Sequence, residues 1–408
     1  MKNPIRIWLD DAHAAPDTRH VDTCDGIRAA AIMIVAWFHI WQQSWLYPGI
    51  DAFGAHLSFD PLVRSGYMWV DIMILISGFC LALPWSRLRW EGGAKPDVLD
   101  FYAKRMIRIH PSYMLAVTVM FAVAVATGAY RSMDHLKLDI FSHMTYTHTF
   151  FYDAYYASNL GGALWTLAIE LQFYLIFPFI AREFLKSPVM TITAMIATAL
   201  AVRGYIADTY ADISLYFNQL PAYLDSFALG MLAAEVHVWL SRKRPNAMTR
   251  IVCSLGCVLL LPFFWTLVCD QARASGTAAI RMGQMMHRLP LSTLGALLLV
   301  LSANAGLIVR RILGNPVTRF ISAVSMQFYI WHQTLAVWIL QYRLIPSACE
   351  HPNYEGDHRW QVIYTAVCFL GGLAVAAVLT YGFERPVAKW LQKKWNAWRG
   401  EKRAKKEA

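Results

Sequence analysis

The sequence predicts an all-α fold, a polytopic membrane bundle of about ten transmembrane helices with both termini in the cytoplasm. Three observations predict this class. Of the 408 residues, 57% are hydrophobic and 16% are charged, whereas soluble chains carry about 25% charged residues. Apolar stretches near the ~20 residues that one span needs recur along the chain. Lys and Arg gather in a few loops and near the C-terminal end, and the formal net charge is +10.

The apolar stretches predict the positions of the spans. We expect helices at about 26–46, 67–86, 112–129, 163–182, 189–207, 220–240, 251–269, 289–309, 317–342 and 361–383. They form a transmembrane domain over 26–385, between a cytoplasmic N-terminal segment (1–25) and a basic cytoplasmic tail (386–408). The N-terminal residues lack an apolar core and a small-residue cleavage site, so we do not expect a cleaved signal peptide.

The distribution of Lys and Arg predicts the orientation. The loops after the second and sixth spans are basic, whereas the opposite loops are poorer in Lys and Arg. The positive-inside rule therefore places the basic loops and the tail in the cytoplasm. We expect the chain in a bacterial inner membrane. The loop near 270–288 is the exception, with Arg273, Arg281 and Arg288. No base-contacting element is visible, so we expect no nucleic-acid partner.

Cysteine usage predicts neither a metal site nor a disulfide framework. The seven Cys are an odd number and lie mostly in apolar stretches, where a thiol is usually a small core residue. Cys269 and Cys349 both fall near the predicted outer face, and a disulfide between them stays open.

Several ionisable residues lie inside predicted spans, where each is a candidate site residue because lipid excludes charge. Arg28 and His39 are eleven residues apart in the first span, on nearly one helix face and ~16 Å apart along its axis. Asp71 opens the second span, with Gly78 on the same face, where another helix could approach closely. Glu170 lies in the fourth span.

His332 lies in the ninth span, with Ser325 and Tyr329 on its own face. Together with His39 and the two carboxylates it falls at the middle or outer half of the bilayer. An imidazole oriented by a carboxylate is an efficient general base for a hydroxyl. The same groups also suit a proton relay, or simple interhelical hydrogen bonds.

Two further features leave alternatives open. Arg105 and Arg108 are neighbours on one helix face, and guanidinium groups bind phosphate oxygens bidentately. They could equally hold the helix against lipid headgroups. The aromatic residues of the 130–162 loop are typical of an interfacial belt, and less often of a platform for a sugar ring.

The order of motifs resembles the acyltransferase-3 family of integral membrane acyltransferases. The motifs are DGIRAAAIMIVAWFHI, VDIMILISGF, RMIRIHPSY, ALWTLAIELQFY, SMQFYIWH and YGFERP, and they span nearly the whole chain. The resemblance implies transfer of an acyl group, commonly acetyl, from cytoplasmic acyl-CoA to a hydroxyl of a glycan or lipid-linked sugar at the outer face. Many relatives carry an extra soluble outer domain, so here a separate extracytoplasmic partner protein is expected to supply it.

The resemblance carries over to individual residues. It matches Arg28 and His39 of the first span, the pair Arg105 and Arg108, and Glu170. Departures are Ser325-Met326, where the family has Ser-Tyr, and Met73 and Ile74, where aromatic residues are frequent. All these replacements are apolar, so they bear on packing more than on chemistry.

We therefore expect a membrane O-acyltransferase acting in polysaccharide O-acetylation of the cell envelope. His39 is the general base or a covalent acyl carrier, and Glu170, or less favourably Asp71, orients it. Arg105 and Arg108 grip acyl-CoA phosphates, with Arg28 along the route of the thioester arm. Either backbone amides or the helix face with Ser325, Tyr329 and His332 could stabilise the oxyanion. A proton-coupled transporter is the alternative, with the buried His, Asp and Glu as its relay.

Overall fold

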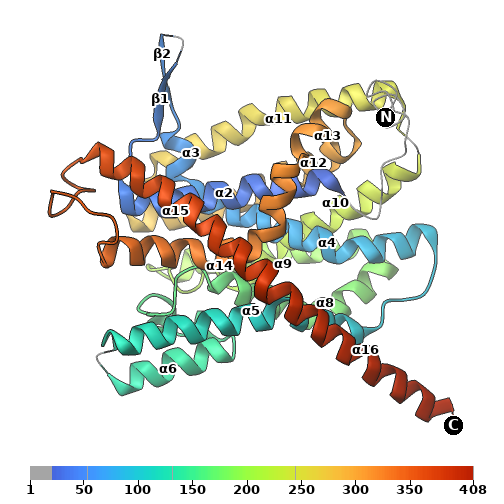
Figure 1. Ribbon diagram of the computed structural model, residues 1–408. Helices are drawn as coiled ribbons and strands as arrows, with labels where there is room; N and C mark the ends of the chain where they lie inside the picture. The colour runs from blue at the N-terminus through green and yellow to red at the C-terminus, as the bar shows by residue number, and fades with distance from the viewer. Residues whose placement is uncertain (1–20, 53, 131, 244, 408) are drawn as a thin grey trace, which may run out of the picture. The chain divides into compact units, whose positions relative to one another are not determined.

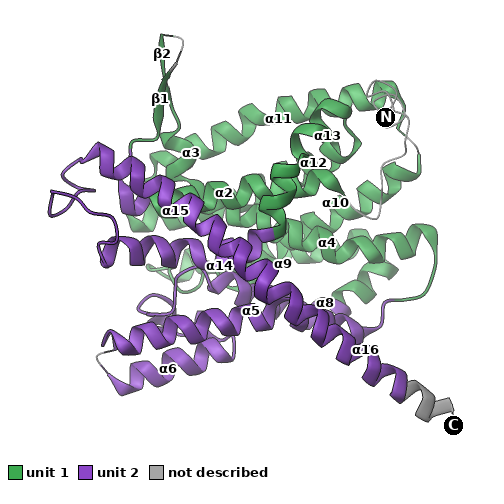
Figure 2. Ribbon diagram, viewed as in Figure 1, with its two compact units in different colours: residues 1–41, 47–95, 179–323 green, residues 42–46, 96–178, 324–408 purple. Residues whose placement is uncertain are grey.

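A computed structural model describes residues 21–52, 54–130, 132–243 and 245–407. These residues are largely helical (Figure 1). They form two compact units (Figure 2). Unit 1 comprises Met1–Trp41, Tyr47–Lys95 and Phe179–Ala323, and unit 2 comprises Gln42–Leu46, Pro96–Pro178 and Val324–Ala408. The predicted absence of a signal peptide concerns residues that lie largely outside the described part.

Unit 1 contains the elements before Lys95, apart from the last turn of α2, together with the helices from α9 to α13. Its elements are α2 (Asp22–Ser44, up to its last turn), β1 (Gly49–Ala52), β2 (Ala55–Ser58), α3 (Asp60–Arg64), η1 (Gly66–Trp69), α4 (Val70–Glu91), α9 (Pro188–Thr209), η3 (Leu220–Tyr223), α10 (Leu224–Arg242), α11 (Ala247–Arg273), α12 (Thr277–Asn304) and α13 (Leu307–Leu313). The strands form an antiparallel hairpin in which Gly49 pairs with Ser58 and Ala52 with Ala55. No strand was predicted in this segment.

The core of unit 1 is built on close contact between α4 and α10, which pack side by side. Gly78 of α4 faces the backbone of Phe227, and Gly230 of α10 faces the backbone of Leu75, so closely that a Cβ at either glycine would collide. Small residues allow two helix backbones this approach. The predicted close contact of a helix at Gly78 is thus confirmed.

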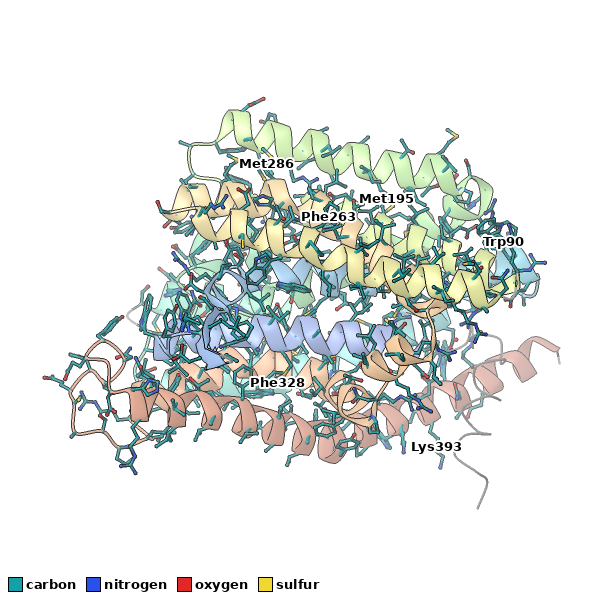
Figure 3. The ribbon with its side chains drawn as sticks, turned by 90° about the horizontal axis from the view of Figure 1, so that it is seen from above. Trp90, Met195, Phe263, Met286, Phe328 and Lys393 are labelled. Atoms are coloured by element: carbon teal, nitrogen blue, oxygen red, sulfur yellow. The ribbon has the colours of Figure 1, made fainter. Side chains whose placement is uncertain are left out.

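Unit 2 is formed by α5 (Val98–Ala126), α6 (Met133–Met144), η2 (His148–Phe150), α7 (Tyr152–Tyr155), α15 (His358–Leu379), η4 (Thr380–Glu384) and α16 (Arg385–Glu407). It also holds the first part of α8 (Trp165–Lys186) and the greater part of α14 (Pro316–Gln341). Phe328 of α14 is fully buried (Figure 3). The residues predicted as a basic tail form α16, whose Trp395 and Arg399 contact Asp100 and Asp97 at the start of α5.

Seven helical segments among the described residues are long and apolar enough to cross a membrane: Asp22–Ser44, Gly66–Glu91, Val98–Ala126, Pro188–Thr209, Ala247–Arg273, Thr277–Asn304 and His358–Glu401. Several of these segments expose large apolar side chains. Phe263 on α11 is 61% exposed and Met286 on α12 is 54% exposed (Figure 3), as expected for side chains that face lipid.

Three more predicted spans coincide with α8, α10 and α14, which are not among these seven. Polar side chains lower the mean hydropathy of all three helices. On α10 the side chains of Asp225, Glu235 and His237 are buried, and a helix enclosed by protein can hold groups that lipid would exclude. The count of about ten spans and the side of each terminus remain predictions.

Two helices begin earlier than their apolar runs. The apolar run predicted at 112–129 belongs to α5, which starts at Val98 after the Asp97 side chain caps its first turn. The run predicted at 289–309 belongs to α12, which starts at Thr277. Most of the predicted loop at 270–288 is therefore helical, and Arg288 is completely buried within it.

Candidate active site

Arg28 lies on α2 in a polar cluster of unit 1. Its Nη1 lies 3.8 Å from a carboxylate oxygen of Asp25 and donates to the Ser322 hydroxyl at 3.3 Å. Its Nη2 lies 3.5 Å from the Cys80 sulfur. Ser322 in turn donates to Asp25 at 2.7 Å. The guanidinium is thus oriented by a carboxylate and a hydroxyl, and a fifth of its side chain (22%) is exposed.

His39 lies three turns further along α2 and is partly exposed. Its ring meets the Phe38 ring edge-on, with centroids 4.9 Å apart. Phe38 in turn meets the ring of Tyr67, with centroids 5.0 Å apart. Aromatic edges therefore restrict the imidazole on one side.

Asp71 lies on α4 with no exposed surface and pairs with the equally buried Arg288 of α12, at 3.5 Å from Nε. Arg288 also donates to the carbonyls of Phe217 and Ala222 and lies 3.5 Å from the Tyr223 ring centroid. The neighbouring pair Arg203–Asp225, at 2.6 Å, is buried too. Buried charges of this kind are tolerated when they are paired. The carboxylate of Asp71 is therefore used to neutralise Arg288.

Arg105 and Arg108 lie on α5 in unit 2. The Arg105 guanidinium lies 5.5 Å from the ring centroid of Phe101 and 5.5 Å from that of Tyr174. Within the described part of the chain its Nε is buried without a hydrogen-bond partner. Arg108 is exposed and lies within electrostatic range of Glu384. Aromatic faces position the Arg105 cation without cancelling its charge.

Glu170 lies on α8, where its carboxylate accepts a 2.5 Å hydrogen bond from the Tyr174 hydroxyl one turn later. Tyr174 carries Arg105 on its ring face. Glu170 also lies within electrostatic range of Tyr329 on α14. The structure therefore brings the predicted residues Arg105, Glu170 and Tyr329 into one neighbourhood of unit 2.

His332 and Ser325 lie on the same helix as Tyr329, and both are buried. Nδ1 of His332 lies 2.8 Å from the Tyr329 carbonyl and 3.0 Å from the Phe328 carbonyl. A nitrogen between two carbonyls must carry the proton, so Nε2 presents a lone pair. A neutral His332 would thus accept a hydrogen bond through Nε2, whereas an oxyanion needs a donor.

Three residues without a predicted role form a hydrogen-bonded group in unit 2: Gln327, Ser112 and Glu384. Gln327 donates at 2.7 Å to the Ser112 hydroxyl of α5 and at 3.0 Å to Glu384 of η4. Glu384 belongs to the Glu-Arg-Pro motif and closes a π-helical turn, a feature often found at functional sites. All three residues lie within motifs that carry the family resemblance, and that is the signal by which the sequence could have found them.

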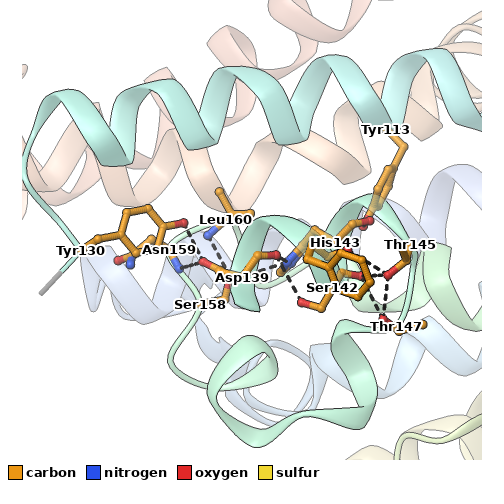
Figure 4. A network of polar contacts seen from close by, with 11 residues as sticks. Tyr113, Tyr130, Asp139, Ser142, His143, Thr145, Thr147, Ser158, Asn159 and Leu160 are labelled. Carbon is orange, nitrogen blue, oxygen red and sulfur yellow. Dashed lines mark hydrogen bonds and ion pairs between the residues drawn. The ribbon is translucent and has the colours of Figure 1, made fainter. Parts of the chain in front are cut away.

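The 130–162 segment, predicted as an aromatic loop, is organised by a buried carboxylate. Asp139 accepts hydrogen bonds from Tyr130 and Ser158, both at 2.7 Å, and from the Asn159 amide at 3.1 Å. It also pairs with His143 at 3.2 Å (Figure 4). Several aromatic side chains stay half exposed outside this network: Phe150, Phe151, Tyr152 and Tyr156.

The predicted site residues are divided between the two units. Arg28, His39 and Asp71 belong to unit 1, and the others to unit 2: Arg105, Arg108, Glu170, Ser325, Tyr329 and His332. Cys269 and Cys349 are both free thiols.

Comparison with known proteins identifies related chains. Over 175 residues the chain is 26% identical to the peptidoglycan O-acetyltransferase OatA of Listeria monocytogenes, covering 41% of this chain and 25% of the relative. Over 351 residues it is 22% identical to a proposed O-acetyltransferase of Staphylococcus aureus (strain COL), covering 79% and 52%. Over 235 residues it is 27% identical to nodulation protein 10 of Rhizobium leguminosarum bv. viciae, covering 52% and 59%.

The chain therefore spans between a quarter and about three fifths of the length of these relatives. No solved structure matches it. A family model described as an acyltransferase domain matches residues 22–381, which include every predicted site residue. Because this match covers most of the helical membrane chain, the protein belongs to the acyltransferase-3 family.

Proposed function

We propose that the chain is a membrane O-acyltransferase that moves an acetyl group from acetyl-CoA to a hydroxyl of an envelope glycan. Family membership and two relatives named for O-acetyl transfer support the reaction class, and the name of one relative supports a glycan such as peptidoglycan as the acceptor. A proton-coupled transporter is not favoured, because the family is one of acyltransferases.

The observation that carries the donor assignment is the Arg105 cation. Two aromatic rings hold it, and no carboxylate pairs with it among the described residues. A charge kept in this way can bind an anion at little cost, because no existing ion pair must break. With Arg108 one turn on, it would bind phosphate oxygens of acyl-CoA from the cytoplasmic side.

His39 would act on the acceptor. As a general base it would take the proton of the hydroxyl while the oxygen attacks the thioester carbonyl and the CoA thiolate leaves. A covalent acyl-His39 would instead transfer the group in two steps. Arg28 would lie along the path of the thioester arm, where Asp25 and Ser322 fix its orientation.

Glu170 is the better candidate to orient His39, since Asp71 already neutralises Arg288. Among the residues assigned to the oxyanion, the hydroxyls of Ser325 and Tyr329 can donate hydrogen bonds. The tautomer of His332 favours an acceptor role through Nε2 instead. We therefore propose Ser325 and Tyr329 as oxyanion donors, with His332 as a neighbouring base.

The test uses the full chain in lipid nanodiscs with acetyl-labelled acetyl-CoA and a muropeptide acceptor. His39→Ala should lower acetyl transfer by about 100-fold or more, the usual contribution of a general base, with unchanged protein abundance. Retained transfer would remove the base assignment. A wild-type chain that neither hydrolyses nor transfers the label would overturn the proposed reaction.

The donor assignment is tested by a second variant, Arg105→Ala with Arg108→Ala. Losing two phosphate contacts should raise the KM for acetyl-CoA by about tenfold or more. The matched control is Arg310→Ala with Arg311→Ala, which removes two arginines from the last turn of α13. An unchanged KM in the first double variant, or an equal rise in the control, would contradict the donor site.

A further inference from the structure

Unit 2 contains a cavity where α2 and α14 end. It has a volume of about 370 Å³, within the range of small-molecule sites. Gln42 and Gln43 of the last turn of α2 line one side. Arg343, at the end of α14, and the loop that leads to α15 line the rest. The loop belongs to the segment that the sequence predicts at the outer face.

One exposed aromatic side chain of the cavity lining pairs with a second one just outside the lining. Tyr354 lines the cavity and is 73% exposed, and Trp45, which follows the end of α2, is 45% exposed. Their ring centroids lie 6.2 Å apart with the planes inclined by 38°. Exposed aromatic faces beside polar groups are what an amphipathic ring such as a sugar requires, because its C–H face packs on the aromatic ring while its hydroxyls reach the polar groups.

Two residues near the cavity have a strained backbone conformation. Trp45 has φ 52° and Arg343 has φ 47°, in the left-handed region where glycine is normally found after a helix. Arg343 closes α14 through hydrogen bonds from its own amide to Leu340 and from the Leu344 amide to Ile339. Such residues persist where the surroundings hold them, and they cluster at ligand clamps.

The side-chain amides of Asn353 and Gln361 fix the backbone at the end of α2. Asn353 donates to the Gln43 carbonyl at 3.1 Å, and Gln361 donates to the Trp45 carbonyl at 3.5 Å. Gln361 also donates to the Asn353 carbonyl at 3.1 Å. The last turn of α2 and the loop beyond α14 are therefore tied together, so that the cavity wall and the aromatic pair form one unit.

The residues that line the cavity indicate which chemical class of ligand it binds. Gln42, Gln43 and His351 offer hydrogen-bond donors and acceptors, whereas Arg343 and Glu350 contribute opposite charges. A pyrophosphate or an anionic lipid would be opposed by the Glu350 carboxylate. An acyl chain would place apolar atoms against this polar wall. A polyhydroxylated ligand with amide substituents suits both the polar wall and the aromatic faces.

We infer that this cavity binds the acceptor glycan, with Trp45 and Tyr354 packing against an amino-sugar ring and the glutamines reading its hydroxyl and amide groups. The inference rests on the proposed function. Gln43 follows His39 by four residues on α2, ~6 Å along the helix axis. A sugar held at this end of α2 would therefore present a hydroxyl within about one helical turn of the level of the proposed base.

The test measures binding of a β-1,4-linked N-acetylglucosamine tetramer to the full chain in nanodiscs by saturation-transfer difference NMR. The wild-type chain should bind the tetramer, and Trp45→Ala or Tyr354→Ala should weaken binding by about tenfold. Trp45→Phe keeps an aromatic face and should bind almost as the wild type does. Trp45→Gly removes the ring without the positive-φ strain that Trp45→Ala keeps, so it should lose binding as Trp45→Ala does.

The control is Trp398→Ala on α16, since Trp398 is 45% exposed, as Trp45 is. It should bind the tetramer and hydrolyse acetyl-CoA as the wild type does. Wild-type protein that ignores the tetramer, or Trp45→Ala and Trp45→Gly variants that bind it normally, would overturn the acceptor site. Failure of the reaction itself would appear separately, as loss of label release from acetyl-CoA by the wild-type chain.

Discussion

Asp139 illustrates how one carboxylate orders a long connection next to a membrane. Its side chain is fully buried and has four partners: Tyr130, Ser158, Asn159 and His143. Burial raises the pKa of Asp139, but hydrogen bonds from His143, Ser158 and Tyr130 outweigh burial, so the pKa lies below its usual value. The ionised form is thus the one that the fold selects.

This predicts how the segment responds to acid. A carboxyl whose folded-state pKa is depressed stabilises the fold above its unfolded-state pKa, and that contribution disappears as the pH falls through the folded-state pKa. The 130–160 segment should therefore resist proteolysis down to about pH 4 and open below it. Limited proteolysis by pepsin across pH 2–5, with cleavage sites mapped by mass spectrometry, measures this.

Asp139→Asn should remove the pH dependence and destabilise the protein by about 3 kcal/mol, because the donors Tyr130, Ser158 and His143 lose their carboxylate acceptor. Thermal unfolding in detergent provides the readout. Asp153→Asn is the control, since Asp153 is exposed on α7. If Asp139→Asn were cut at the same sites and with the same pH profile as the wild type, the network would not order this segment.

Asp71 marks the limit of what a single residue reveals in a sequence. An ionisable residue inside a predicted span indicates a functional site, because burying a charge in lipid has a high free-energy cost. The partner that neutralises Asp71 is Arg288, which the sequence assigns to a loop and which appears there as an exception to the positive-inside rule. That exception was the available signal: an arginine on the wrong side is explained once it is buried in an ion pair.

At the scale of elements, the contact between α4 and α10 is the most specific packing feature of unit 1. A methyl group at Gly78 would collide with the Phe227 backbone rather than with a movable side chain. Gly78→Ala should therefore destabilise the protein by about 2 kcal/mol, although alanine is normally the better helix former by about 1 kcal/mol. Thermal unfolding in detergent measures the change.

Gly204→Ala on α9 is the matched control, because no atom lies within 4 Å of the position that its Cβ would take. It should leave the unfolding temperature unchanged or raise it slightly. If the two alanine variants unfolded at the same temperature, α4 and α10 could move apart without a free-energy cost. That result would contradict the close packing of the two helices at Gly78.

Apolar periodicity predicts helices well and their ends poorly. The spans expected at 26–46, 189–207 and 317–342 each lie within four residues of α2, α9 and α14 at both ends. The starts of α5 and α12 were missed, because charged and polar residues such as Lys104 and Arg281 interrupt the apolar pattern between each start and the predicted span. The β1–β2 hairpin was missed because short strands between spans have no hydropathy signal.

At the scale of the whole molecule, the sequence was sufficient to predict the family. It was not sufficient to predict which side chains contact the candidate site residues. The motif order that resembles the acyltransferase-3 family is confirmed by the match over 22–381. Spacing along one helix predicts that Arg28 and His39 lie on nearly one helix face, and that Arg105 and Arg108 do so too. Two contacts join helices that are distant in sequence: the Tyr174 ring packs on Arg105, and Gln327 donates to Glu384. A local sequence pattern cannot predict such contacts.

Orientation is the remaining whole-molecule prediction, and Cys349 offers a direct test. In a Cys269→Ser background, a membrane-impermeant maleimide should label Cys349 in intact cells, because the positive-inside rule places its loop outside. Local desolvation and a hydrogen bond to Glu355 raise the pKa of the Cys349 thiol, so labelling should be slow near pH 7 and faster near pH 9.

The opposite side is tested with Glu91→Cys, at the exposed end of α4, in a chain that also carries Cys349→Ser. The basic loop after α4 is expected in the cytoplasm, so this thiol should react only after the membrane is permeabilised. Labelling of Glu91→Cys in intact cells with protection of Cys349 would invert the topology. The cavity beside Trp45 would then face the cytoplasm, and an acceptor outside the cell could not reach it. Labelling of both thiols in intact cells would break the two-sided arrangement on which donor and acceptor assignments both depend.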